Sequence, residues 1–198
     1  MIHDEVRQRI VSQAHQHFMT HGFRGVTMDE LASDLGMSKK TLYSHFESKR
    51  LLLEAVVENK LRRVDEDLAL VVAKSSTDFP TALEQLIACV RHHTEEIQPP
   101  FLRDLTRETP DLLKRVQTRR RSLFHKHIGS ILGEGKKRSL IRKDVKIDLM
   151  IESLVGAADT LMNPQKLLEL GISAKTCLSS IIMIFLEGVV VRKERENP

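Results

Sequence analysis

The chain has 198 residues, of which 29% are charged and 41% hydrophobic. This composition excludes a disordered or low-complexity polypeptide and allows a sizeable buried core. The net charge of +4 permits nucleic-acid binding, but the basic residues of positions 1–64 outnumber the acidic ones only slightly. Any DNA affinity must therefore come from where the positive charges lie rather than from bulk charge.

We expect a cytoplasmic protein without a cofactor or a membrane partner. The start of the chain is polar, so we expect no signal peptide, and the longest apolar run, Ile181 to Leu186, is too short to span a bilayer. Cys89 and Cys177 lie far apart on apolar helical patterns. They are expected to be buried free thiols rather than a redox-sensing pair.

Apolar residues at helical spacing predict an all-α fold of about nine helices. The first helix carries Val6, Ile10 and Phe18 on its apolar face and should end near Gly22. Residues 27–49 then have the pattern of two short helices joined by a tight turn. Helix-turn-helix units have this organisation, and their second helix can lie in the major groove of DNA.

Capping signals fix the ends of these two helices. Thr27 and Glu30 have the spacing of a capping box, in which each side chain satisfies a backbone N–H of the helix start. Gly36 should end the first helix in the left-handed conformation, and Ser38 can cap the second. Leu42 and Phe46 should face inward, which leaves the polar residues of the second helix on its outer face.

The outer face carries side chains suited to DNA. Lysines and hydroxyls can contact phosphates or base edges, and Tyr43 carries a hydroxyl suited to one phosphate. Lys49 lies at the start of the next helix, where backbone N–H groups also favour a phosphate. The plainer interpretation is a packing unit of three helices that never contacts nucleic acid. The candidate readout residues are Ser38, Lys39, Lys40, Thr41, Ser44 and His45.

The remainder of the chain predicts six more helices. A long helix follows from Leu51 through Val64, residues 74–80 form a linker, and a helix precedes Pro99-Pro100. A short piece covers residues 101–105, and a long helix opened by Pro110 continues to Ile131. Residues 133–146, with two glycines and a basic cluster, are predicted to form a loop or frayed end. A solvated loop is favoured there over a second nucleic-acid or membrane patch.

The last two predicted helices are the most apolar, and the final one is apolar on nearly every side. A helix that is apolar all round must be buried on all sides, which a symmetric dimer would achieve. A dimer would also let two recognition helices address two half-sites of an operator. The predicted interface residues are Met150, Leu154, Ala158, Leu161, Leu178, Ile181, Ile182 and Phe185.

Residues 6–60 resemble the tetracycline-repressor (TetR/AcrR) family of bacterial transcriptional regulators. The resemblance is carried by the F-x-x-x-G-F-x-x-V-T pattern of Phe18 to Thr27, by MDELASDLGMSKKTLYSHF, and by S-K-x-x-L-L. It implies a DNA-binding domain over residues 1–50 with the motif at 27–46, a linking helix over 51–74, and a helical effector-binding and dimerisation domain over 78–198. It also implies phosphate contacts for Thr27, Tyr43 and Lys49. The adjacent Lys39 and Lys40 depart from the family pattern and indicate strong electrostatic binding.

These observations predict a ligand-responsive regulator, most simply a repressor, that binds a palindromic double-stranded operator as a homodimer and is released by a small-molecule effector. The alternative is an effector-independent helix-turn-helix module that binds DNA or another protein. The chain has no glycine-rich phosphate loop or nucleophile elbow, so we expect no enzyme. Its histidines lack metal-ligand spacing, so we expect no metal site. Arg119, Arg120 and Arg121 are expected to be solvated, with an effector pocket for an acidic ligand as the alternative.

Overall fold

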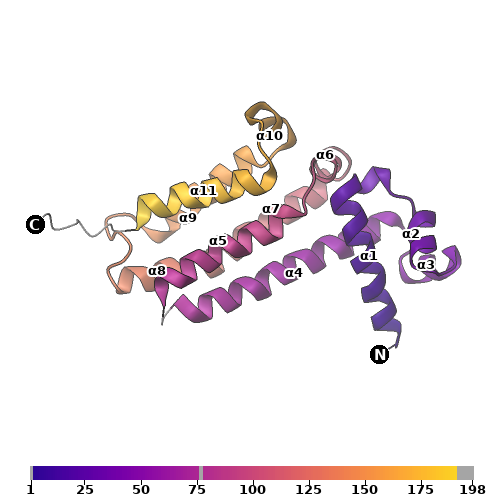
Figure 1. The fold of residues 1–198 in the computed structure, drawn as a ribbon, viewed down its shortest axis with the longest axis horizontal. Helices are drawn as coiled ribbons and strands as arrows, with labels where there is room; N and C mark the ends of the chain where they lie inside the picture. Colours follow the sequence, from indigo (N-terminus) through magenta and orange to yellow (C-terminus); the bar gives the residue numbers. More distant parts are fainter. Residues whose placement is uncertain (1, 76–77, 191–198) are drawn as a thin grey trace, which may run out of the picture.

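The computed structural model describes residues 2–75 and 78–190. Within these ranges the protein is all-α, as predicted: eleven α-helices, one π-helical turn and a single isolated β-bridge between Ile141 and Val190. Figure 1 shows a small N-terminal unit at one end of an elongated bundle, with α4 running from it along the whole bundle. The helix α5 lies along α4, and α9 and α11 form an outer layer.

The N-terminal unit consists of α1 (Ile2–Gly25), α2 (Met28–Asp34) and α3 (Lys39–His45). The prediction that the first helix ends near Gly22 is close, because α1 is kinked there with φ +81° and ψ +164° and continues for one more turn. A Cβ atom at this glycine would lie 2.6 Å from Oδ2 of Asp104, so both the dihedral angles and the close approach require glycine.

The helix α4 (Lys49–Ser75) is much longer than its predicted apolar pattern, and α5 (Phe79–Glu95) begins sooner than expected. The predicted linker over residues 74–80 is therefore shorter, and its residues 76–77 lie outside the described ranges. Pro80 falls in the first turn of α5, where a missing N–H costs nothing, and Asp78 caps this helix by accepting from the N–H of Thr81 at 3.2 Å. The proline thus begins a helix rather than ending a linker.

The next helices are α6 (Pro99–Glu108), α7 (Pro110–Leu123), the π-helical turn η1 (Phe124–Ile128) and α8 (Gly129–Lys137). Two predictions are wrong here. The helix from Pro110 is interrupted by η1, and residues 133–137 are helical rather than a loop. Gly135 lies within α8 as a packing residue and does not mark a loop. A Cβ atom at this position would lie 2.5 Å from Ile141 and 2.6 Å from Phe79, so only glycine fits there. The loop begins only at Arg138.

The chain ends with α9 (Ile147–Leu161), α10 (Pro164–Leu170) and α11 (Ala174–Val189). The short α10 was not predicted, although Asn163 caps it by accepting from the N–H of Lys166 at 2.9 Å and Gly171 ends it with φ +64°. Ser173 caps α11 as predicted. This extra helix and the division of the helix from Pro110 account for the difference from the nine expected.

Two hydrophobic cores lie along α4. The first joins α1, α2, α3 and the start of α4 to Phe101, Leu105 and Leu112 of α6 and α7, and the second fills the bundle from Leu68 to Val189. The start of α4 belongs to the first core and its end to the second. The N-terminal core therefore includes side chains from far beyond residue 50.

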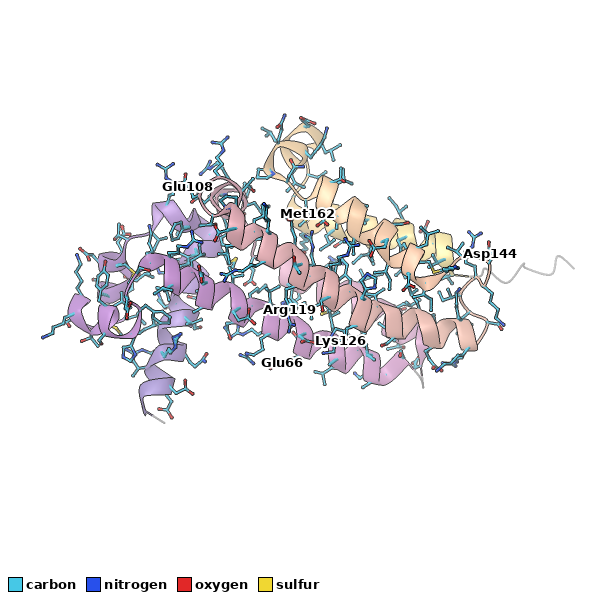
Figure 2. All side chains as sticks on the ribbon, turned by 180° about the vertical axis from the view of Figure 1, so that it is seen from behind. Glu66, Glu108, Arg119, Lys126, Asp144 and Met162 are labelled. Atoms are coloured by element: carbon cyan, nitrogen blue, oxygen red, sulfur yellow. The ribbon has the colours of Figure 1, made fainter. Side chains whose placement is uncertain are left out.

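Charged side chains bind α4 to α7 and η1 on the outside of the bundle (Figure 2). The carboxylate of Asp65 accepts from Arg119 at 3.3 Å and from Lys126 at 2.7 Å, and the buried His127 lies 2.6 Å from it. These interactions hold the pKa of Asp65 below its usual value, with the hydrogen bond from Lys126 as the main cause. The predicted solvated arginine at 119 is thus an interhelical partner.

No single helix among the described residues is both long and apolar enough to cross a bilayer. The one combination that passes by length and composition is α10 with α11, and these meet at 80°.

Candidate nucleic-acid interface and effector cavity

The capping box that begins α2 is present as predicted. The backbone N–H and the hydroxyl of Thr27 donate to Glu30 at 2.7 and 2.9 Å, and the Glu30 N–H donates back to the hydroxyl at 3.1 Å. The hydrogen bond from the Thr27 backbone is the largest cause of the lowered pKa of Glu30. The box fixes the start of α2, and Thr27 remains exposed.

The helix α3 presents a polar outer face over an apolar inner one. Ser38 caps it by accepting from the N–H of Thr41 at 3.0 Å, and the buried Leu42 and Phe46 anchor it to the first core. Ser44 donates to the Thr41 carbonyl at 2.7 Å. The exposed residues of this face are Ser38, Lys39, Lys40, Thr41, Tyr43 and Ser44, whereas His45 is half-buried.

Lys39 contributes a positive charge that is paired within the motif. Its ammonium lies 2.8 Å from Asp29 of α2, and this hydrogen bond raises the pKa of Lys39. Both side chains are more than half exposed, so a phosphate can compete with the carboxylate for the lysine. Lys40 is exposed next to it.

Lys49 differs from the other predicted DNA-contact residues because its ammonium group contacts the segment between α1 and α2. It is half-buried, its ammonium donates to the carbonyl of Val26 at 2.8 Å, and it lies 4.5 Å from the ring centroid of Phe23. Partial burial lowers the pKa of Lys49. The residue therefore ties the start of α4 to the segment between α1 and α2, a role that its sequence position alone did not indicate.

Two arginines that sequence reasoning did not single out also hold the motif in place. Arg9 donates to the carbonyl of Leu35 at the end of α2 at 2.9 Å, and the guanidinium of Arg7 lies 4.3 Å from the ring centroid of Phe46. Their partners are far away in the sequence, so no local spacing could identify these contacts.

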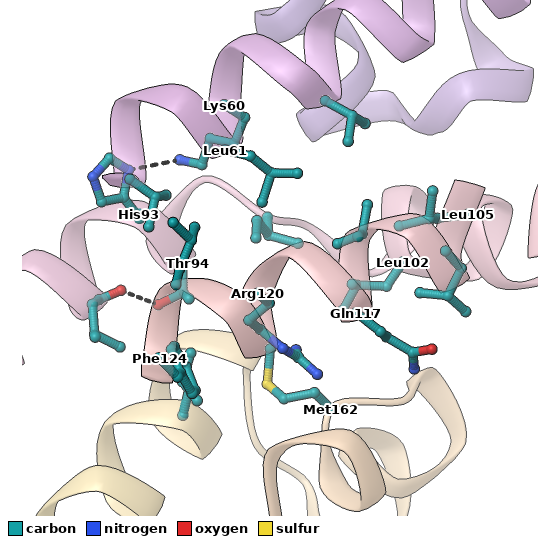
Figure 3. Close-up of a pocket in the computed structure, with 18 of the residues that line it drawn as sticks. Lys60, Leu61, His93, Thr94, Leu102, Leu105, Gln117, Arg120, Phe124 and Met162 are labelled. Atoms are coloured by element: carbon teal, nitrogen blue, oxygen red, sulfur yellow. Dashed lines mark hydrogen bonds between the residues drawn. The ribbon is translucent and has the colours of Figure 1, made fainter. Parts of the chain in front are cut away.

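The second candidate site is a cavity of about 180 Å³ between α4, α5, α6, α7 and α9. Its wall is mostly apolar, with Phe101, Leu102 and Leu105 contributed by α6. Figure 3 shows Lys60 and His93 on one side of it and Gln117 and Arg120 on the opposite side. The combination of an apolar wall and a few polar groups is typical of a small-molecule site.

A chain of polar residues connects this cavity to α1. Glu96 lies 2.9 Å from the ring of His15 in α1 and accepts from the ammonium of Lys60. Lys60 also donates to Nδ1 of His93 at 3.2 Å, and Nε2 of the same ring lies 2.8 Å from Asp67. Burial and the neighbouring lysine lower the pKa of His93. Burial would raise the pKa of Glu96, but hydrogen bonds from His15 and Lys60 outweigh it and hold that pKa at about 2.

The predicted dimer residues lie mostly in the chain's own core. Leu161 and Phe185 are half-buried, and the remaining six are buried, namely Met150, Leu154, Ala158, Leu178, Ile181 and Ile182. The apolar surface of α9 and α11 consists instead of Leu149, Met183 and Ile184, which are 60%, 51% and 70% exposed. The apolar pattern alone could not distinguish these two faces, because α11 is apolar on both.

No group of three or more histidine, cysteine, aspartate or glutamate side chains in the described part of the chain has the geometry to hold a metal ion. Cys89 lines the cavity and Cys177 is buried, and burial raises the pKa of both thiols, to about 11 for Cys89. Neither thiol is activated for chemistry at neutral pH.

Residues 10–56 match the family model of bacterial regulatory proteins of the tetR family. The N-terminal unit is therefore a DNA-binding domain of the TetR type. The match covers the kinked α1, the two capped helices and the start of α4, which form the unit described above. The chain is accordingly a DNA-binding transcriptional regulator with an N-terminal domain of the TetR type.

Similarity to known proteins extends over nearly the whole chain. The HTH-type transcriptional regulator YvaF of Bacillus subtilis is 24% identical over 96% of this chain and 98% of its own length. A protein from Saccharomonospora viridis in complex with choline has a TM-score of 0.67 at 22% identity, covering 96% of this chain and 100% of that one. The TetR-family repressor FadR of Thermus thermophilus, in complex with lauroyl-CoA, has a TM-score of 0.56 at 20% identity, covering 97% and 99%. At these identities the solved structures establish the shared fold.

Proposed function

We propose that this regulator is a repressor that binds a palindromic operator as a homodimer and leaves it when a small molecule fills the cavity. The repressor FadR and the choline-bound protein, each with a small molecule in the same fold, support a ligand-controlled mechanism. The proposal assigns base readout to Ser38 through His45 and phosphate contacts to Thr27, Tyr43 and Lys49. Residues 78–198 would hold the dimer contacts and, together with α4, the effector.

The observation that carries the proposal is the position of α6 between the two sites. Phe101 and Leu105 line the cavity and also belong to the first core. On the same helix, the buried Asp104 accepts from the backbone N–H of Arg24 at 2.8 Å, just beyond the kink in α1. A ligand that displaces α6 would therefore move α1 and with it the orientation of α3.

Such coupling is reciprocal, since an effector that weakens DNA binding must itself bind less tightly to the DNA-bound protein. The effector-independent module is the competing function, and it would show no dependence of DNA affinity on any ligand of the cavity. The cavity beside α6 favours the ligand-controlled repressor.

The direct test is fluorescence anisotropy with duplex DNA from the region upstream of the protein's own gene, measured over a range of salt concentrations. We expect specific binding whose affinity falls steeply with salt, as phosphate contacts require. The absence of binding at low salt, for a protein shown to be a folded dimer, would contradict the operator-binding function.

The dimer is tested separately with the exposed apolar residues of α11. Replacing Ile184 by aspartate should give a monomer in analytical ultracentrifugation, because the charge would be buried against a second copy. Leu168→Asp is the matched control, since this leucine is 83% exposed on α10, away from the proposed contact. A dimer that survives Ile184→Asp would rule out this face.

A further inference from the structure

Arg120 of α7 is the cavity residue whose hydrogen bonding is incomplete. One terminal nitrogen donates to the carboxylate of Asp159 in α9. Its Nε–H is buried and has no acceptor within the described residues. A buried, charged donor without a partner is costly, so a ligand that supplies an acceptor at this point gains the interaction that the protein leaves unmade.

The two neighbouring arginines do not share this position. Arg119 pairs with Asp65 on the outside of the bundle, and Arg121 pairs with Glu152 of α9. Successive helical residues point about 100° apart, so only the middle arginine of the three faces the cavity. The alternative raised by the sequence, an arginine in a pocket for an acidic ligand, thus applies to one residue.

Two of the three charged side chains that line the cavity are cations. They are Lys60, whose partner Glu96 lies outside the wall, and Arg120, whose partner Asp159 is the carboxylate of the wall. Asp159 is also 35% exposed, compared with 20% for Arg120. Water can therefore solvate the aspartate if a ligand takes its place, whereas the guanidinium would stay in the cavity wall.

Size and wall chemistry limit the remainder of the ligand. The cavity volume is about 180 Å³, and an engineered apolar cavity of about 150 Å³ in another protein holds one benzene molecule. Near Arg120 the wall includes the apolar side chains of Phe124 and Met162 (Figure 3). The site thus suits one compact apolar body with one anionic group.

We propose that the cavity binds a small monocarboxylic acid whose apolar body is about the size of a benzene ring, with the guanidinium of Arg120 turning to bring its covered Nε–H to the cavity, where the carboxylate accepts from Nε and a terminal nitrogen. Side-on pairing of this kind is the geometry in which guanidinium and carboxylate groups form their strongest hydrogen bonds. The inference rests on the proposed function only in taking this cavity as the effector site.

Isothermal titration calorimetry on the full chain tests the ligand class. The probes are benzoate and 4-methylbenzoate, with benzamide as the neutral analogue and benzylamine as the cationic one. We expect the carboxylates to bind at least tenfold more tightly than benzamide. Equal affinities, or tighter binding of benzylamine, would overturn the inference, and this comparison requires no variant.

Variants then test the role of Arg120. Arg120→Met should lower benzoate affinity at least tenfold and leave benzamide affinity within about threefold. Arg120→Lys keeps the charge and removes the planar pair of donors, so it should also lose most of the preference for the carboxylate. Arg119→Met is the matched control, because the side chain of Arg119 faces Asp65 and not the cavity. This variant should bind benzoate as tightly as the natural protein does. An equal loss in Arg119→Met and Arg120→Met would overturn the assignment.

Anisotropy with operator DNA separates this inference from the proposed function. Carboxylate binding that depends on Arg120 but does not release DNA would support the inference and contradict effector release. DNA release by neutral compounds that bind better than carboxylates would support the proposed function and overturn the ligand class.

Discussion

The helix-turn-helix unit and the effector cavity differ in the sequence distance between their polar partners. In the former, Thr27 pairs with Glu30 and Ser38 with Thr41, three residues apart in each case. Around the cavity, Arg120 pairs with a residue 39 positions away, and Glu96 with one 81 positions away. The caps that fix the two helices of the motif can therefore form locally, whereas the cavity exists only once the whole bundle has packed.

The largest expected effect tests the contact between the two regions. Gly22→Ala would place a Cβ atom 2.6 Å from Asp104 at a φ of +81°, so strain and a clash act together. We expect a loss of about 3 kcal/mol in the free energy of unfolding, measured by urea denaturation. Gly36→Ala in the turn of the motif is the control, because its φ is +63° but nothing lies within 4 Å, and it should lose only about 1 kcal/mol. Equal losses would show that α6 does not restrain α1 as described.

The second prediction concerns two glycines of α8, in the larger core. Gly135→Ala would overpack Ile141 and Phe79 and should cost about 2 kcal/mol in the same measurement. Gly133→Ala would meet only Ile147 at 3.9 Å and should stabilise the protein by about 0.5 kcal/mol, because alanine favours the helix. Stabilisation by both substitutions would mean that the core around Phe79 is loosely packed.

The third prediction returns to the DNA-binding unit. Lys49→Ala should weaken operator binding about tenfold without changing sequence preference, as expected for a phosphate contact. It should also reduce the free energy of unfolding by about 1 kcal/mol, since the hydrogen bond to the Val26 carbonyl is lost. Lys137→Ala, at the far end of the bundle, should change neither quantity. Unchanged DNA affinity with reduced stability would leave Lys49 with its structural role alone.

The smallest expected effect concerns Glu96, whose pKa is about 2 in the folded protein against an ordinary value of 4.5. A carboxylate with a lowered pKa stabilises the fold above its unfolded pKa, and this contribution is lost as the pH falls through the folded pKa. The difference in unfolding free energy between the natural protein and Glu96→Gln should therefore decline from pH 4.5 to pH 2. Because the side chain is 40% exposed, screening limits the effect to about 1 kcal/mol. If the difference in unfolding free energy stays constant between pH 4.5 and pH 2, the charge of Glu96 does not stabilise the fold.

The structural features that could be predicted from the sequence are those that depend on neighbouring residues. Caps at Thr27, Ser38 and Ser173, and the left-handed Gly36, all follow from side chains within a few positions. The features that could not be predicted depend on packing between residues far apart in the sequence. Gly135 resembles a loop residue until Phe79 and Ile141 are placed against it.

The cavity was beyond prediction for the same reason. Nothing in the sequence near Arg120 separates it from the arginines on either side, and its selection depends on where α4 and α9 lie. In the same way, Lys49 contacts the carbonyl of Val26 only because α4 is folded back against the segment before α2.

The π-helical turn η1, just after the three arginines, has a consequence for which of them meets a ligand. A π-helical turn holds one more residue than an α-helical turn, so α7 and α8 are offset by about one residue, or about 100°. Removing one residue from Phe124–Ile128 would restore a regular helix and rotate α7 by that angle relative to α8. A neighbouring arginine would then replace Arg120 at the cavity. The length of this single turn thus sets which side of α7 faces the cavity, and with it both the guanidinium and the apolar residues that a ligand would meet.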